Sequence, residues 1–137
     1  MEKKKTLSAQ DVLKGSKRLN QKTEEINDLI SILRGVIPWR PGVSMDEARR
    51  AEYPAFRHGG DDYFLVFQEN VSNVNVSLQG RRGVHSEMAM SRFDAMQLES
   101  AHVVELHARL DDLMEAVLQA FPHARREKLE LLASQAR

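Results

Sequence analysis

The sequence of 137 residues predicts an α+β domain that spans the whole chain, residues 1–137. Two observations lead to this fold class. Apolar residues recur at helical spacing toward both ends of the chain, and they alternate with polar residues in the middle. The predicted order is a long N-terminal helix, a short helix, a three-stranded antiparallel meander, a long C-terminal helix and a final short helix.

The first long helix is expected from Ser8 to Gly35. Ser8 is a good N-cap, and Pro38 follows shortly after the residue at which the helix should end. Gly15 should loosen the first turns by about 1 kcal/mol relative to alanine. Residues 1–8 are expected to form a flexible basic arm. The apolar positions of the helix repeat every seven residues, at Val12, Leu19, Ile26 and Leu33.

Residues 36–61 contain three of the four prolines and are expected to form a loop-rich connection. Within it, Ser44 and Glu47 have the spacing of a capping box. This spacing predicts a two-turn helix from Met45 to about Glu52, which Pro54 would end.

Three segments of alternating apolar and polar residues follow, and this pattern predicts three strands. Gly59-Gly60 predicts a turn before the first strand, and the segment QGRRG is typical of a hairpin loop between the second and the third. An antiparallel meander is therefore expected. The strands are predicted at Tyr63–Phe67, Val74–Leu78 and Val84–Met90.

The second long helix is expected to run without interruption from Ser91 to Pro122, about 30 residues. A short amphipathic helix should follow, with its apolar side formed by Leu129, Leu131 and Leu132. Three strands cover only part of the apolar surface of two long helices, so part of it should be buried between two copies of the chain. We therefore expect a homodimer, with self-association through Val103, His107, Leu110, Met114 and Val117.

Composition limits the classes of function. Twenty basic and twenty acidic residues cancel, so no overall field draws the whole protein to DNA or to an anionic membrane. The absence of cysteine excludes disulfides and thiolate metal sites and suits a reducing cytoplasm. The longest apolar run, YFLVF, is far shorter than the roughly 20 residues that a membrane helix needs. A cytoplasmic protein without membrane contact is expected.

The second long helix contains one Glu-x-x-His motif, Glu99 and His102, followed by His107. Dimetal sites in helical bundles need a second such motif on a facing helix. His102 and His107 also diverge by about 140 degrees on a regular helix, so no metal site is predicted. These polar residues either find partners on a facing helix and fix its register, or they face water.

His58, Asp61 and Asp62 flank two glycines and could line an acid-base or metal site. A loop with solvated charges is the more common origin of such a pattern. The sequence contains no Walker loop, nucleophile elbow, His-Glu-x-x-His motif or dinucleotide fingerprint. It therefore predicts neither an enzyme nor a cofactor.

Basic residues gather near the N-terminus and in two pairs, Arg49-Arg50 and Arg81-Arg82, and could contact the phosphates of a nucleic acid. The order helix, three strands, helix resembles that of the YbaB family of small bacterial nucleoid-associated proteins. This resemblance of element order implies a dimer that binds DNA. The candidate anion or nucleic-acid contacts are Lys14, Lys17, Arg18, Lys22, Arg81 and Arg82.

These patterns favour a non-enzymatic protein-interaction or regulatory protein, such as an adaptor, an inhibitor or a chaperone-like protein. It would act on an unknown protein partner through amphipathic helix surfaces. The alternative is a DNA-binding regulatory or nucleoid-associated-like protein whose basic N-terminal helix contacts nucleic acid.

Overall fold

The computed structural model describes the chain at residues 7–16, 22–42, 44, 46–58, 60–70, 73–80, 87–89 and 100–136. The described part mixes helices and strands, and this confirms the predicted fold class in outline. Its elements are, in chain order, α1 (Ala9–Gly15), α2 (Lys22–Val36), β1 (Arg50–His58), β2 (Asp61–Glu69), β3 (Val74–Gly80), β4 (Glu87–Ala89), α3 (Ser100–His107), α4 (Leu110–Ala120) and α5 (Arg126–Gln135).

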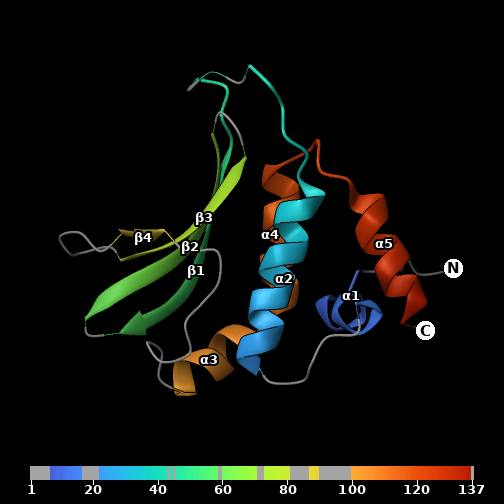
Figure 1. Ribbon diagram of the computed structural model, residues 1–137. Coiled ribbons are helices and arrows are strands. Elements are labelled where there is room, and N and C mark those ends of the chain that lie inside the picture. Colours follow the sequence, from blue (N-terminus) through green and yellow to red (C-terminus); the bar gives the residue numbers. More distant parts are fainter. Residues whose placement is uncertain are drawn as a thin grey trace, which may run out of the picture.

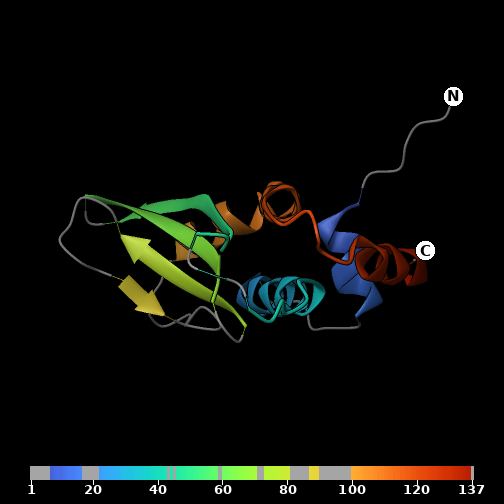
Figure 2. The ribbon, with the colours of Figure 1, turned by 90° about the horizontal axis from the view of Figure 1, so that it is seen from above.

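The elements form three layers, with the sheet on one side, α2 and α4 in the middle, and α1 with α5 on the other side (Figures 1 and 2). α3 lies across the end at which α2 begins. One cluster of buried apolar residues runs through all three layers, from Leu65 and Phe67 in the sheet to Leu129 in α5. Arg34 also joins the middle layer to the sheet, because its Nε donates to the carbonyl oxygen of Val74 at 3.2 Å.

The sheet contains three long antiparallel strands and the three-residue β4, in the order β1-β2-β3-β4. β2 and β3 confirm two of the predicted strands. The third predicted strand is described at β4, and its first residues lie outside the described part. Alternate residues of each long strand face the helices, since successive side chains of a strand point to opposite faces. The buried inner face includes Ala51, Ala55, Leu65, Phe67, Val74, Val76 and Leu78.

β1 was not expected, and the predicted helix from Met45 to Glu52 is wrong. Ser44 and Glu47 form a turn instead, in which the Glu47 N–H donates to the Ser44 carbonyl oxygen at 3.0 Å. The chain then enters β1 at Arg50 and pairs with β2. Pro54 does not end a helix here. It is exposed in a strand at the sheet edge, where a residue without an N–H is tolerated.

Arg109 covers the middle of the β1 edge, at Pro54 and Ala55. The pairing register of β1 and β2 shifts at Ala55, as in a β-bulge. The Arg109 guanidinium donates to the carbonyl oxygen of Pro54 at 2.9 Å and to that of Ala55. Burial raises the pKa of the Tyr53 hydroxyl, which donates to the Arg109 carbonyl oxygen at 3.3 Å. A covered edge is a poor template for another strand.

The same contacts explain why the predicted long C-terminal helix is wrong. The helix is broken at Ala108 and Arg109, and α3 and α4 point in different directions (Figure 1). Arg109 bonds β1 through both its carbonyl oxygen and its side chain, so the break is held against the sheet edge. The predicted start of this helix, at residues 91–99, lies outside the described part.

The predicted long N-terminal helix is also wrong, because α1 and α2 are separate helices in different layers. α1 ends at Gly15, where a Cβ atom would lie 1.9 Å from the carbonyl oxygen of Leu132 in α5. Gly15 thus allows the backbones of α1 and α5 to approach closely. The amide of Ala9, at the start of α1, donates to the carboxylate of Asp111 in α4.

α5 confirms the predicted final helix. Leu129 is buried and Leu132 half-buried, as expected, but Leu131 is 59% exposed and does not belong to the packed side. Ala133 takes a buried position instead.

Gly15→Ala is expected to lower the free energy of unfolding by about 1–3 kcal/mol, because the added methyl group would meet the backbone of Leu132. Gly35→Ala is the matched control. Gly35 is also helical, in α2, and no described atom lies within 4 Å of its added Cβ. This substitution should raise the free energy of unfolding by up to about 1 kcal/mol. Urea denaturation measures both, and equal effects would contradict the packing of α1 on α5.

Candidate functional site

A buried carboxylate, that of Glu69, lies at the end of β2, where the sheet meets the ends of α2 and α4. Glu69 is 5% exposed. Its Oε1 accepts from Nη2 of Arg40 at 2.6 Å and from the backbone N–H of Arg49 at 2.9 Å. Its Oε2 accepts from Nε of Arg40 at 3.2 Å and lies 2.9 Å from Nε2 of His123. The carboxylate therefore has partners on both oxygens.

These contacts join β2 to two other parts of the chain, the connection between α2 and β1 and the turn between α4 and α5. Arg40 follows α2, Arg49 precedes β1, and His123 lies in the turn between α4 and α5. A further bond closes the same region, because the Arg125 N–H donates to the Val36 carbonyl oxygen at the end of α2, at 2.9 Å. The connection between α2 and β1 is thus fixed at both ends, although it contains little regular structure.

The partners of Glu69 set its protonation state. Burial alone would raise the pKa of this carboxyl group. The hydrogen bonds from Arg40 and from the Arg49 N–H, with the charges of Arg40 and His123, outweigh burial and lower the pKa below its ordinary value. The hydrogen bond to Glu69 also raises the pKa of Arg40, so that the pair remains ionised.

The pKa of His123 is lowered. Burial of the ring is the largest cause, the charge of Glu69 opposes it, and the charges of Arg40 and Arg49 add to it. Both guanidinium groups therefore act electrostatically on the same ring. His123 is expected to be neutral at pH 7.

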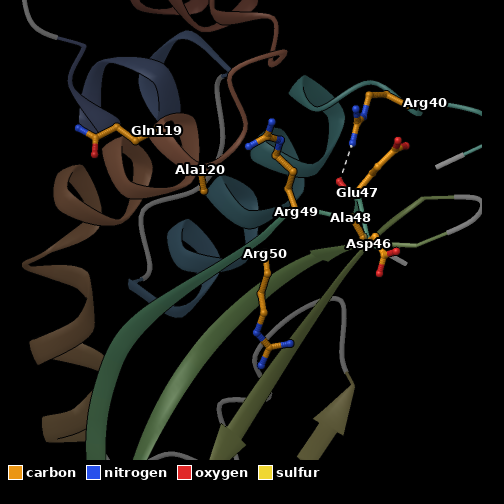
Figure 3. A pocket seen from close by; sticks show the side chains of 8 residues that line it. All are labelled: Arg40, Asp46, Glu47, Ala48, Arg49, Arg50, Gln119 and Ala120. Atoms are coloured by element: carbon orange, nitrogen blue, oxygen red, sulfur yellow. Dashed lines mark hydrogen bonds between the residues drawn. The ribbon is translucent and has the colours of Figure 1, made fainter. Parts of the chain in front are cut away.

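An open pocket of about 720 Å³ lies beside this cluster (Figure 3). Two of its three arginines are used by the fold. Arg40 binds Glu69, and Arg50 on the outer face of the sheet donates to the side chains of Glu52, Gln68 and Gln79. The guanidinium of Arg49 makes no hydrogen bond or ion pair within the described part of the chain. The pocket is lined by Arg40, Asp46, Glu47, Ala48, Arg49, Arg50, Gln119 and Ala120.

Trp39, the single tryptophan of the chain, immediately precedes Arg40. It is 55% exposed, although it is a large apolar side chain. Trp39, Arg40, Glu69 and His123 were not predicted as functional residues from the sequence. One signal for Glu69 was present, because it continues the inward-facing positions of Leu65 and Phe67 along β2. A charged residue at such a position requires a partner.

The residues predicted for self-association are buried in the chain's own core. Val103 is 8% exposed, and Leu110, Met114 and Val117 are 2% exposed or less. His107 belongs to the same region, and its Nε2 lies 2.5 Å from Oε1 of Glu25 in α2. His107 is therefore satisfied by a facing helix, which was one of the two interpretations of this histidine.

Lys14 and Lys22, among the predicted anion contacts, are exposed on α1 and α2. Lys17, Arg18, Arg81 and Arg82 lie outside the described part of the chain.

The backbones of His58 and Asp61 lie opposite each other at the end of the β1–β2 hairpin, where Gly60 has a φ of 86° that favours glycine. This reversal confirms the predicted turn. Asp62 is exposed and lies 3.4 Å from Nε of Arg57. The hairpin end therefore presents the exposed ion pair of Arg57 and Asp62.

Glu99 lies outside the described part, and the His102 ring stacks on Phe56 with 5.0 Å between the centroids. Among the described residues, no three carboxylate or imidazole side chains are grouped as metal ligands would be. The structure thus gives the Glu-x-x-His motif a packing contact at His102.

The chain matches no protein-family model, no curated protein and no solved structure in the comparisons with known proteins. Within the described residues, no helix combines the length and the apolar character that crossing a membrane would require. The candidate site is therefore defined by its own geometry.

Acidification is expected to destabilise the fold in two steps. The folded-state pKa of His123 is lowered from about 6.5, so the unfolded chain binds this proton first and stability falls as the pH drops below about 6.5. The folded-state pKa of Glu69 is lowered from about 4.5, so its contribution is complete above that pH and is lost as the pH falls through the lowered value. Urea denaturation at a series of pH values measures both steps.

His123→Gln provides the control. This variant should lose the part of the pH dependence that begins near 6.5 and keep the part that begins near 4.5. If the variant and the original chain show the same pH dependence, His123 does not titrate as its contacts indicate.

Proposed function

We propose that this chain is a non-enzymatic protein-interaction or regulatory protein that acts in the cytoplasm and binds its partner through Trp39 and the neighbouring arginine pocket. The observation that supports the proposal is the 55% exposure of Trp39 in a connection that Glu69 fixes in place. When a partner buries an exposed large apolar side chain, apolar surface is removed from water, and this stabilises the complex.

The composition of this surface supports the same function. Tryptophan and arginine are enriched among the residues that contribute most to protein–protein binding. Trp39, Arg40 and Arg49 lie within one short segment whose ends are held by hydrogen bonds. Because the segment is held before a partner arrives, less conformational entropy is lost on binding than for a free loop.

The proposal moves the interaction surface away from the amphipathic helices. The apolar sides of α2 and α4 are buried between the sheet and the other helices, so they contribute to the core. Leu110, Met114 and Val117 are buried within their own chain, so they are not available as the contact surface of the predicted homodimer. Light scattering of the purified protein decides its oligomeric state.

Trp39→Ala is expected to abolish capture of the protein partner. The original chain and the Leu131→Ala variant are each tagged, cross-linked in the native cells and purified. Both should recover the same partner. The Leu131→Ala variant is the matched control, because it also removes an exposed apolar side chain, but from α5. If Trp39→Ala recovers the partner as well as the control does, the proposed surface is wrong.

DNA binding is the second candidate, and it is favoured by the exposure of Lys14 and Lys22 on consecutive helices. Under this alternative, the protein should bind unrelated duplex DNA at low salt, with an affinity that falls as salt rises. The double substitution Lys14→Gln and Lys22→Gln should then reduce the salt dependence by up to about two released ions. Fluorescence anisotropy with labelled DNA measures this, and binding that does not respond to salt would exclude the candidate.

A further inference from the structure

Arg49 differs from the other two arginines of the pocket. The Arg40 guanidinium is held by both oxygens of Glu69, and that of Arg50 by three side chains on the outer face of the sheet. The backbone of Arg49 is fixed, since its N–H donates to Glu69 and its carbonyl oxygen accepts from the Glu69 N–H at 3.0 Å. Its guanidinium has no hydrogen-bond partner within the described residues. The described part of the chain therefore positions a cation without pairing it.

The direction of the side chains separates the pocket into two sides. Figure 3 shows Arg49 extending between Arg40 and Ala120, whereas Arg50 extends the other way, across the strands. Asp46 also points away from the Arg49 guanidinium. Arg40 and Arg49 both line this side of the pocket. The Arg49 side of the pocket is thus the more positive side.

We propose that this side of the pocket binds a carboxylate from an acidic segment of the partner protein, with Arg49 as the principal contact. The inference rests on the proposed function and specifies the chemistry of the partner. A guanidinium with its donors free matches the two oxygens of a carboxylate.

The surroundings of Arg49 favour an acidic protein segment over a nucleic acid. The pocket also contains Asp46 and Glu47, which would repel a continuous row of phosphates. Isolated carboxylates on a peptide avoid this repulsion, because the groups between them are neutral. A volume of about 720 Å³ also exceeds that of one carboxylate and accommodates several atoms of a peptide chain. Trp39, which is 55% exposed, precedes the lining residue Arg40 in the chain.

The test uses the full chain and a capped, fluorescein-labelled peptide in which three glutamates alternate with glycines, with a peptide that has glutamines at the same three positions as its neutral counterpart. Anisotropy at low salt should show saturable binding of the glutamate peptide and much weaker binding of the glutamine peptide. Loss of one charged hydrogen-bonding group predicts that Arg49→Gln weakens binding about tenfold or more, and that Arg49→Lys has a smaller effect. Emission from Trp39 should change on binding in the original chain.

Arg126→Gln is the matched control, because Arg126 is an exposed arginine of α5 outside the pocket. It removes the same charge and should leave binding unchanged. Equal losses in Arg49→Gln and Arg126→Gln would mean that net charge alone attracts the peptide, and would overturn the inference. Absence of saturable binding, or tighter Arg49-dependent binding of duplex DNA, would also overturn it. Because Arg49 makes no side-chain bond in the described structure, Arg49→Gln should unfold at the same urea concentration as the original chain.

The result remains distinguishable from a failure of the proposed function. If Trp39→Ala loses the cross-linked partner while Arg49→Gln retains it and binds the peptide normally, the partner surface stands and the acidic segment does not. If both variants retain the partner, both proposals are wrong.

Discussion

The carboxylate of Glu69 has little contact with water, and an ionised carboxylate in such a position is costly unless charges and hydrogen bonds replace its hydration. Arg40 and the amide of Arg49 provide this replacement, and the ring of His123 lies against the same carboxylate. They come from the connection between α2 and β1 and from the turn between α4 and α5, so satisfying one buried charge holds both against the end of β2. The proposed interaction surface depends on this arrangement, because Trp39 and Arg49 each lie within or beside the fixed connection.

Such a cluster constrains the structure more than it stabilises it. Replacing a buried ion pair with apolar side chains is often neutral or stabilising, whereas removing one partner leaves an unsatisfied charge. Glu69 therefore gives little net stability compared with the apolar core, in which Leu65 and Phe67 precede it on the same strand face. Its contribution is specificity, since alternative positions of the connection would leave the carboxylate without Arg40 and the Arg49 amide.

The sequence predicted the elements whose boundaries are set by nearby residues. β2, β3 and α5 follow from periodicity over a few residues and from local turn signals. It failed where a contact between distant residues decides the outcome. The close approach of α1 to α5 at Gly15 involves the backbone of Leu132, and the helix break at Arg109 is held by carbonyl groups of β1 more than 50 positions away. Local capping patterns carry no information about either contact, so both long helices were predicted as continuous.

The candidate site shows the same limit from the functional side. Arg49 and Arg50 are indistinguishable in the sequence as a basic pair, yet the strand alternation that begins at this point directs them to opposite sides. Arg50 reaches the outer face of the sheet, where Gln68 and Gln79 accept its hydrogen bonds. Arg49 precedes the strand and extends toward the end of α4. Charge counting would assign both residues one role, whereas the guanidinium of Arg50 bonds side chains of neighbouring strands and that of Arg49 is exposed to solvent.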